Sequence, residues 1–162
     1  MEYEDFNLLR NNSRGYKRDP PVFFHPRILV GSGEFLTPEF SEKNDITHVI
    51  NCAFEEHSPT WFKNLYPNKY YCLESEDSED LNILDWYDEF KYTLKKFLNE
   101  SNNIYVHCQM GINRSAYLTL TYVCNEMNFP LYRTIITLLR IRPCMFQNKS
   151  YFYEVREFLT NK

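Results

Sequence analysis

Apolar residues along the chain follow two periodicities, and together these predict an alternation of strands and helices. Short runs rich in β-branched and aromatic residues predict strands at residues 22–33, 46–51, 69–73 and 104–106. Apolar residues at helical spacing predict helices at about residues 83–98, 114–127, 131–141 and 151–159, and a shorter one that begins at Thr37-Pro38. Residues 53–68, with two prolines and several polar side chains, are predicted to form a loop. Strands that alternate with helices indicate an α/β fold with helices on both faces of a central sheet.

The first 21 residues are predicted to form an arm outside the main domain. The arm begins with a short helical pattern of apolar side chains, namely Tyr3, Phe6, Leu8 and Leu9. A polar and basic stretch follows and ends at Asp19, because a residue that precedes a proline avoids the helical conformation. The 162 residues suffice for one full core, so residues 22–162 are predicted to form a single domain.

Composition argues against some classes of function. Hydrophobic residues make up 43% of the chain, so burial does not limit folding, while the net charge of −4 argues against a protein that coats nucleic acid. No apolar run approaches the length that spans a membrane, and the acidic start of the chain is unlike a signal peptide. We therefore expect no membrane partner.

The cysteines indicate a reducing compartment and neither a metal site nor a set of disulfides. Their number is odd, their spacing is wide and no Cys-x-x-Cys pair occurs; they are Cys52, Cys72, Cys108, Cys124 and Cys144. The four histidines are scattered, so no zinc site is predicted. An intracellular, cytoplasmic location is expected, since thiols stay reduced there.

One stretch, residues 104–115, combines a nucleophile with a site for an anion. Three β-prone residues lead into Cys108, five loop residues follow, and Arg114-Ser115 opens an apolar helical segment. A strand that turns tightly into a helix directs several backbone N–H groups at one point, which binds an anion and stabilises a thiolate. Arg114 adds a planar guanidinium that can bind two phosphate oxygens at once. The arrangement suits the transfer of a phosphoryl group to sulfur.

His107-Cys108, the five loop residues and Arg114-Ser115 resemble the signature loop of the cysteine-dependent protein phosphatases. The resemblance implies that Cys108 is the nucleophile that becomes phosphorylated, that Arg114 binds the phosphate, and that Ser115 eases departure of the thiolate. It also implies that the phosphate contacts the intervening residues, which are Gln109, Met110, Gly111, Ile112 and Asn113. Neither a metal nor a cofactor is implied.

Segments far from this loop resemble the compact dual-specificity phosphatases of the same superfamily. They include residues 26–31, 46–51 and 140–148, and the resemblance spans about residues 22–160. It implies a central, mostly parallel sheet and the hydrolysis of phosphotyrosine, phosphoserine and phosphothreonine in proteins. The chain lacks the extra tyrosine-stacking loop of the larger tyrosine-specific phosphatases, which favours a shallow cleft and dual specificity.

A general acid is needed as well, because expelling an alcohol from a phosphate ester requires a proton donor near the leaving oxygen. In the resembled family this aspartate lies six residues before the first apolar residue of a helix, often with an asparagine just before that residue. Asn82 and Ile83 occupy those places here, which selects Asp77 from the acidic run at 74–80. Asp80 is the alternative.

Two interpretations of the arm are open. It is loosely held, or its helix docks on a partner subunit. The Leu-Leu-Arg stretch at residues 8–10 resembles the arm of the poxviral dual-specificity phosphatases. That resemblance implies a homodimer and a viral protein, located in the host cytoplasm or the virion.

Two alternatives to a protein phosphatase also stay open. RNA 5′-phosphatases share the loop, and some carry the Gly-x-Asn-Arg pattern found at residues 111–114, so an RNA 5′ end is the alternative substrate. A phosphoprotein-binding pseudophosphatase is the second, although such proteins typically lack the nucleophile or the arginine, and Cys108 and Arg114 are both present. A phosphoinositide phosphatase is disfavoured because residues 109–113 include no lysine.

Overall fold

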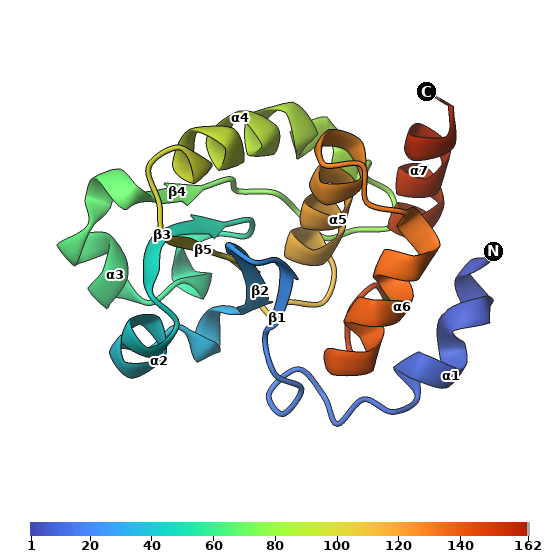
Figure 1. The fold of residues 1–162 in the computed structure, drawn as a ribbon, viewed down its shortest axis with the longest axis horizontal. Helices are drawn as coiled ribbons and strands as arrows, with labels where there is room; N and C mark the ends of the chain where they lie inside the picture. Colours follow the sequence, from blue (N-terminus) through green and yellow to red (C-terminus); the bar gives the residue numbers. More distant parts are fainter. Residues whose placement is uncertain (162) are drawn as a thin grey trace.

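A five-stranded sheet with helices on both faces forms the core of the computed structural model, which describes residues 1–161 (Figure 1). Lys162, the last residue of the predicted main domain, lies outside the described residues. The strands are β1 (Val22–His25), β2 (Ile28–Ser32), β3 (Ile46–Asn51), β4 (Tyr70–Cys72) and β5 (Asn103–Cys108). The helices are η1 (Tyr3–Phe6), α1 (Asn7–Arg10), η2 (Gly33–Phe35), α2 (Pro38–Lys43), η3 (Glu55–His57), α3 (Thr60–Leu65), η4 (Pro67–Lys69), η5 (Ile83–Trp86), α4 (Tyr87–Leu98), α5 (Arg114–Glu126), α6 (Leu131–Ile141) and α7 (Lys149–Thr160).

Strand β5 occupies the centre of the sheet, whose order is β1-β2-β5-β3-β4. It runs parallel to both neighbours, β2 and β3, and only the edge strand β1 is antiparallel. The predicted α/β fold with a central, mostly parallel sheet is therefore confirmed. Because parallel strands end at one edge of the sheet, the loops that follow β2, β3 and β5 gather there.

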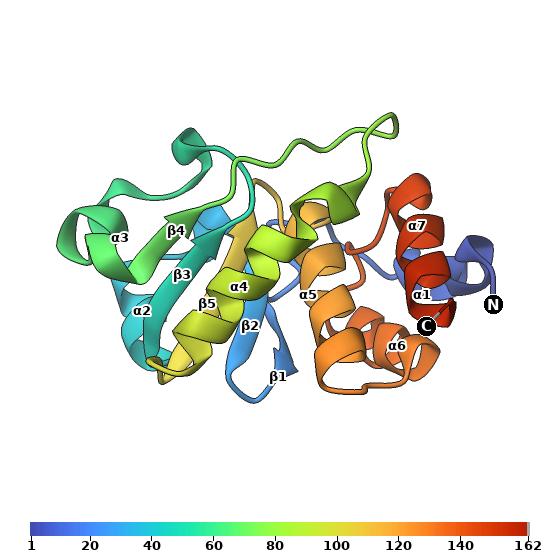
Figure 2. The ribbon, with the colours of Figure 1, turned by 90° about the horizontal axis from the view of Figure 1, so that it is seen from above.

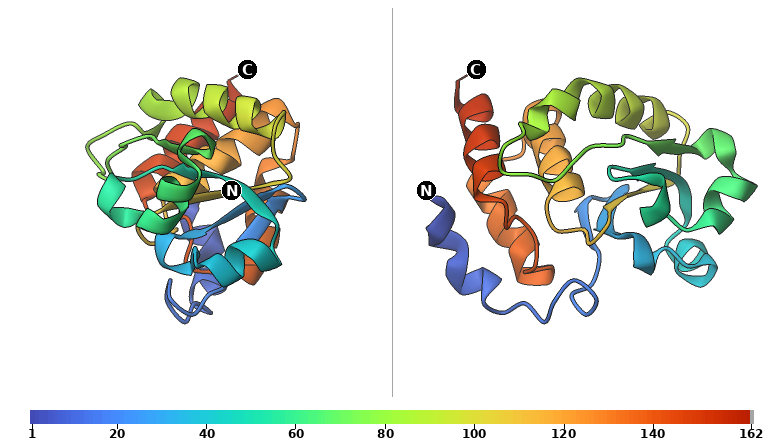
Figure 3. Two further views of the ribbon diagram at one scale, coloured as in Figure 1. Left: turned by 90° about the vertical axis from the view of Figure 1, so that its left-hand side faces the viewer. Right: turned by 180° about the vertical axis from the view of Figure 1, so that it is seen from behind.

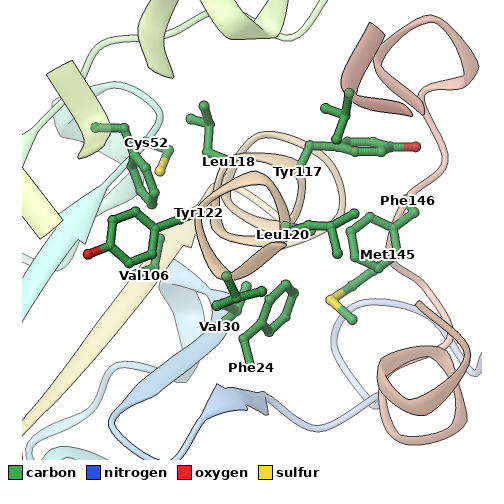
Figure 4. Packing of buried hydrophobic residues seen from close by; sticks show 14 of the residues in the cluster. Phe24, Val30, Cys52, Val106, Tyr117, Leu118, Leu120, Tyr122, Met145 and Phe146 are labelled. Carbon is green, nitrogen blue, oxygen red and sulfur yellow. The ribbon is translucent and has the colours of Figure 1, made fainter. Parts of the chain in front are cut away.

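Side chains of β5 alternate between two separate hydrophobic clusters, one on each face of the sheet. Ile104 and Val106 join the larger cluster beneath α4, α5, α6 and α7, whereas Tyr105 joins the smaller one beneath α2 and α3. Figure 2 shows α4 crossing one face, and Figure 4 shows α5 surrounded by buried side chains of strands and of the 145–146 segment. Burial on both faces fixes the register of β5, since a slip of one residue would exchange its two faces.

Two of the predicted elements differ from the structure. Residues 22–33 form two strands, because the chain turns at Pro26 and Arg27 so that β1 pairs back on β2. Residues 53–68, predicted as a loop, contain α3 between two short 3-10 helices. Pro59 and Pro67 stand at the starts of these helical segments, where a missing N–H costs nothing, and Phe62 of α3 is buried in the smaller cluster.

The N-terminal arm packs on its own chain and is not loosely held. Figure 3 shows η1 and α1 beside α6 and α7. The ring of Phe6 is 1% exposed and lies 5.9 Å from the ring of Phe152 and 6.5 Å from that of Tyr132. Arg10 donates from Nε to the Phe146 carbonyl at 3.1 Å and from Nη1 to the Tyr3 carbonyl at 2.7 Å.

We predict that Phe6→Ala destabilises the whole protein by roughly 3 kcal/mol, because it leaves a cavity between the arm and α7. Leu8→Ala on the same arm is the matched control, since Leu8 is 84% exposed. Urea unfolding measures both variants. Equal midpoints for Phe6→Ala and Leu8→Ala would show that the arm contributes nothing to stability.

Candidate active site

Cys108 lies at the carboxyl end of the central strand, where the chain turns through a short loop into α5. Its side chain is only 3% exposed, and its Sγ lies 3.2 Å from Oγ of Ser115 in the first turn of the helix. The loop needs a glycine at Gly111, which has φ of +69° and passes so close to β2 that a Cβ would lie 2.4 Å from the Gly31 oxygen. The structure thus brings Cys108 and Ser115 together as the signature loop requires.

Arg114 is the first residue of α5 and is buried, with 7% of its surface exposed. Its Nη1 donates to the Ser75 carbonyl at 2.9 Å, while its Nε has no hydrogen-bond partner among the described residues. A buried charged donor without a partner costs free energy, which an incoming oxyanion would recover. The guanidinium is therefore fixed at one end and has bonding capacity left, at the start of the helix that follows the Cys108 loop.

His107 supports the strand end as a neutral ring. It is fully buried, and burial lowers the pKa of His107 to about 4. Since a carbonyl only accepts, Nδ1–H donates to the Cys108 oxygen at 3.0 Å, and Nε2 accepts from the Ser58 hydroxyl at 2.9 Å. The ring fixes the peptide of Cys108 without adding a charge.

Arg142 is a site residue that the sequence did not single out. It is fully buried and donates to the carbonyls of Met110 at 2.7 Å and Gly111 at 3.2 Å. It also bonds the carbonyls of Asp19 and Tyr16, both in the N-terminal arm. A peptide whose carbonyl is held from one side presents its N–H to the other, so Arg142 turns loop N–H groups toward the anion site. The signal in the sequence was an arginine in an apolar helix end just before Pro143.

The other predicted loop residues contribute in different ways. Gln109 is exposed and Met110 is half-buried, while the buried Ile112 accepts at its carbonyl from the Phe146 N–H at 2.8 Å. Asn113 uses its side chain, whose Oδ1 accepts from the N–H groups of residues 147 and 148 at 2.9 and 2.8 Å. These bonds attach the loop to the segment before α7.

Asp77 lies beside this loop although it is 31 residues away in sequence from Cys108. Its exposed carboxylate accepts from Asn113 Nδ2 at 3.0 Å and from Asn148 Nδ2 at 3.1 Å. Asp80, the alternative acid, is exposed, and its own N–H donates to the Ser78 hydroxyl. Of the two candidates, Asp77 is the one in contact with the loop.

Two other cysteines, Cys52 and Cys72, are held as thiols. Cys52 is fully buried, and burial raises the pKa of its thiol well above the usual value, with the nearby Cys108 adding to the effect. Burial likewise raises the pKa of Cys72 to about 12. No disulfide joins any of the cysteines within residues 1–161. A protonated thiol is a poor nucleophile, so neither Cys52 nor Cys72 is prepared to attack an oxidised Cys108.

Within residues 1–161, no three His, Cys, Asp or Glu side chains come together in a way that could hold a metal ion. Over the same residues, every helix is too short or too polar to cross a membrane.

The fold and the loop define a cysteine-dependent phosphatase scaffold, and comparison with known proteins places the chain within it. Residues 28–161 match the family model described as "Dual specificity phosphatase, catalytic domain". The chain belongs to this family. The predicted membership, made from the loop and from the segments around it, is confirmed.

Similar proteins include Slingshot phosphatases and human DUSP28. The chain is 26% identical over 137 residues to mouse Protein phosphatase Slingshot homolog 3 and 25% identical over 145 residues to Drosophila melanogaster Protein phosphatase Slingshot. These matches cover 82% and 86% of this chain but only 20% and 13% of the two relatives, so the chain spans a fifth or less of their length. The crystal structure of human DUSP28 superposes with a TM-score of 0.73 at 15% identity, over 88% of this chain and 94% of that one.

We predict that His107 makes the protein less stable as the pH falls. Because its pKa is about 4 in the folded state and about 6.5 when unfolded, the unfolded state binds the extra proton between these values. Stability is therefore fully present above about pH 6.5, and about 3 kcal/mol is lost as the pH falls to 4. Urea unfolding of wild type and His107→Gln at pH 7 and pH 4 tests this. The variant should show a smaller drop, and an equal drop would rule His107 out as the cause.

Proposed function

We propose that this chain hydrolyses phosphate monoesters on phosphotyrosine, phosphoserine and phosphothreonine of proteins, through a phosphorylated Cys108. One observation carries the proposal. A cysteine at the end of the central strand lies 3.2 Å from the hydroxyl of Ser115, and the preceding residue is the buried Arg114, whose Nε is unpartnered within the described residues. Residues 22–162 would be the catalytic domain and residues 1–21 the arm.

In the first step the Cys108 thiolate attacks phosphorus, and the bond to the leaving oxygen breaks as the sulfur–phosphorus bond forms. Arg114 and the N–H groups of residues 109–113 stabilise the charge on the three non-bridging oxygens. Asp77 supplies the proton that the leaving oxygen takes up. Its exposed carboxyl lies at the edge of the loop, where a leaving group can reach it.

In the second step water attacks phosphorus, and the sulfur–phosphorus bond breaks to release inorganic phosphate. Asp77, now ionised, accepts the proton of this water, which restores the acid for the next cycle. The Ser115 hydroxyl donates to the departing sulfur, and its 3.2 Å distance from Sγ supports that role. The chemistry proposed here uses only groups of the chain and water.

Two features of the site bear on the substrate. Residues 109–113 carry no charged side chain, so the loop itself offers nothing to a second phosphate. The exposed acidic residues beside Asp77 repel a polyanion, which disfavours an RNA triphosphate. A phosphorylated side chain on a protein places only one phosphate in the loop. We therefore propose phosphoproteins as substrates.

We also propose an intracellular, cytoplasmic location. A viral source rests on the resemblance of the arm alone.

We propose separately a homodimer through the arm. The packing of the arm on its own chain limits which of its side chains could contact a second subunit. Phe6 at the end of η1 is buried by its own chain, while Leu8 in the adjoining helix α1 is 84% exposed. A dimer that keeps the arm in place would use Leu8. Sedimentation of the wild-type chain against Leu8→Glu tests this; a wild-type monomer would exclude the dimer at the concentration used.

We predict metal-independent phosphate release from both phosphotyrosine and phosphothreonine peptides, and little release from 5′-triphosphorylated RNA. Cys108→Ser should lower turnover on the order of a thousandfold or more, because an alkoxide does not form in place of the thiolate. Asp77→Asn should lower it about a hundredfold or more. A preference for RNA would move the function to RNA 5′ ends. Binding of phosphopeptides without release would identify a binding module.

A further inference from the structure

One face of the last helix contacts the whole segment that carries Asp77. Asn148, which caps α7, and Tyr151 and Glu154 follow one another at intervals of three residues, so their side chains lie on the same side of the helix. Each of them is hydrogen-bonded to a part of residues 76–84.

The three contacts follow the segment from one end to the other. Asn148 Nδ2 donates to Asp77 Oδ1 at 3.1 Å. The Tyr151 hydroxyl donates to the Glu76 carbonyl at 2.9 Å and accepts from the Ser78 N–H at 3.0 Å, so one oxygen holds the peptides on both sides of Asp77. The half-buried Glu154 carboxylate accepts from the first two N–H groups of η5, at residues 83 and 84, at 2.8 and 3.0 Å.

The segment has little else to fix its position. Residues 76–82 belong to no helix or strand. Within these described residues, a single hydrogen bond joins two of their own backbone groups, from the Leu81 N–H to the Ser78 carbonyl at 3.4 Å. Four of these residues are acidic and repel one another. Such a stretch would sample many positions unless a rigid element held it.

Helix α7 is a rigid element. The ring of Tyr151 is fully buried and packs edge-on against Tyr117 at 5.8 Å. The Asn148 side chain also caps the helix by accepting from the Tyr151 N–H at 3.1 Å. The Asn113 side chain joins this end of the helix to the Cys108 loop, because it accepts from the Asn148 N–H and donates to Asp77 Oδ2.

We propose that Asn148, Tyr151 and Glu154 are positioning residues, which hold the Asp77 segment against the Cys108 loop before substrate arrives. The proposal rests on the proposed phosphatase function and adds to it the element that aligns the acid. Through their side chains the three residues bond the segment at residues 76–84, so their effect on the reaction passes through Asp77. In the first step, they therefore affect esters that need a proton donor and spare those that do not.

Tyr151→Phe tests this with the removal of a single oxygen, since the buried ring stays in place. The readout is kcat/KM, which reports the first step alone, because the second step uses Asp77 as a base whatever the ester. We expect kcat/KM on phenyl phosphate, whose leaving group needs a proton, to fall about tenfold or more, because small misplacements of a catalytic group are costly. On 2,4-dinitrophenyl phosphate, whose leaving group departs as an anion, kcat/KM should change less than about twofold, roughly the error of the comparison. In an Asp77→Ala background, Tyr151→Phe should cause no further loss on either ester.

Tyr153→Phe is the matched control on the same helix. The Tyr153 hydroxyl also forms hydrogen bonds, with the Glu2 carboxylate at 2.8 Å and the Tyr3 N–H at 3.4 Å, but on the side of the arm. It should leave both rates unchanged. Asn148→Ser gives a second test, because serine keeps the helix cap and is too short to reach Asp77; it should reproduce the selective loss.

Equal losses on the two esters, or a further loss in the Asp77→Ala background, would overturn the proposal in favour of a purely structural role for α7. Hydrogen exchange supplies a readout that needs no turnover. Amides of residues 76–80 other than Ser78 should exchange faster in Tyr151→Phe than in Tyr153→Phe, and equal exchange would refute the positioning role. A wild-type chain that cleaves neither ester would refute the phosphatase function alone.

Discussion

A buried guanidinium behind the Cys108 loop is the constraint on which the site depends. A loop that presents its N–H groups to an anion must direct its carbonyls elsewhere, and buried carbonyls need donors. Arg142 supplies them to Met110 and Gly111 from a fully buried position. Gly111 then lets the backbone pass against β2, where a side chain would collide. The loop geometry that suits a phosphate thus depends on Arg142 and Gly111, which shape the backbone from the side away from the anion site.

Neutral groups carry out much of the positioning around the site. His107 is kept uncharged by burial, and amides and hydroxyls, not cations, hold the Asp77 carboxylate and its neighbouring peptides. Arg114, which ends the Cys108 loop, is a buried cation whose Nε has no partner within residues 1–161. A single unshared positive charge in a dry site attracts an oxyanion more strongly than one already paired with a carboxylate.

Local pattern predicted the central strand, its loop and the helix after it, because β-branched residues, glycine and helical spacing are all present in residues 104–127. Family spacing selected Asp77, and the structure places it in contact with the loop. The sequence did not predict the hairpin of β1 and β2 or helix α3. In both segments a proline was ambiguous, because prolines occur in loops and turns as well as at the starts of helices. Local pattern could not predict the roles of Arg142 and Tyr151, because the partners of their long-range hydrogen bonds lie between 31 and 126 residues away in sequence.

The hydrogen bonds of Arg142 have one more consequence. The same guanidinium that holds the loop carbonyls also bonds the carbonyls of Tyr16 and Asp19, so the arm and the loop share a residue. If the docked arm favours the loop geometry that binds an oxyanion, it strengthens oxyanion binding. Thermodynamic reciprocity then requires that the bound oxyanion stabilises the docked arm by the same free energy. Binding of an oxyanion at the site and docking of the arm are therefore two coupled equilibria. A measurement of how firmly the arm is docked thus responds to occupancy of the site.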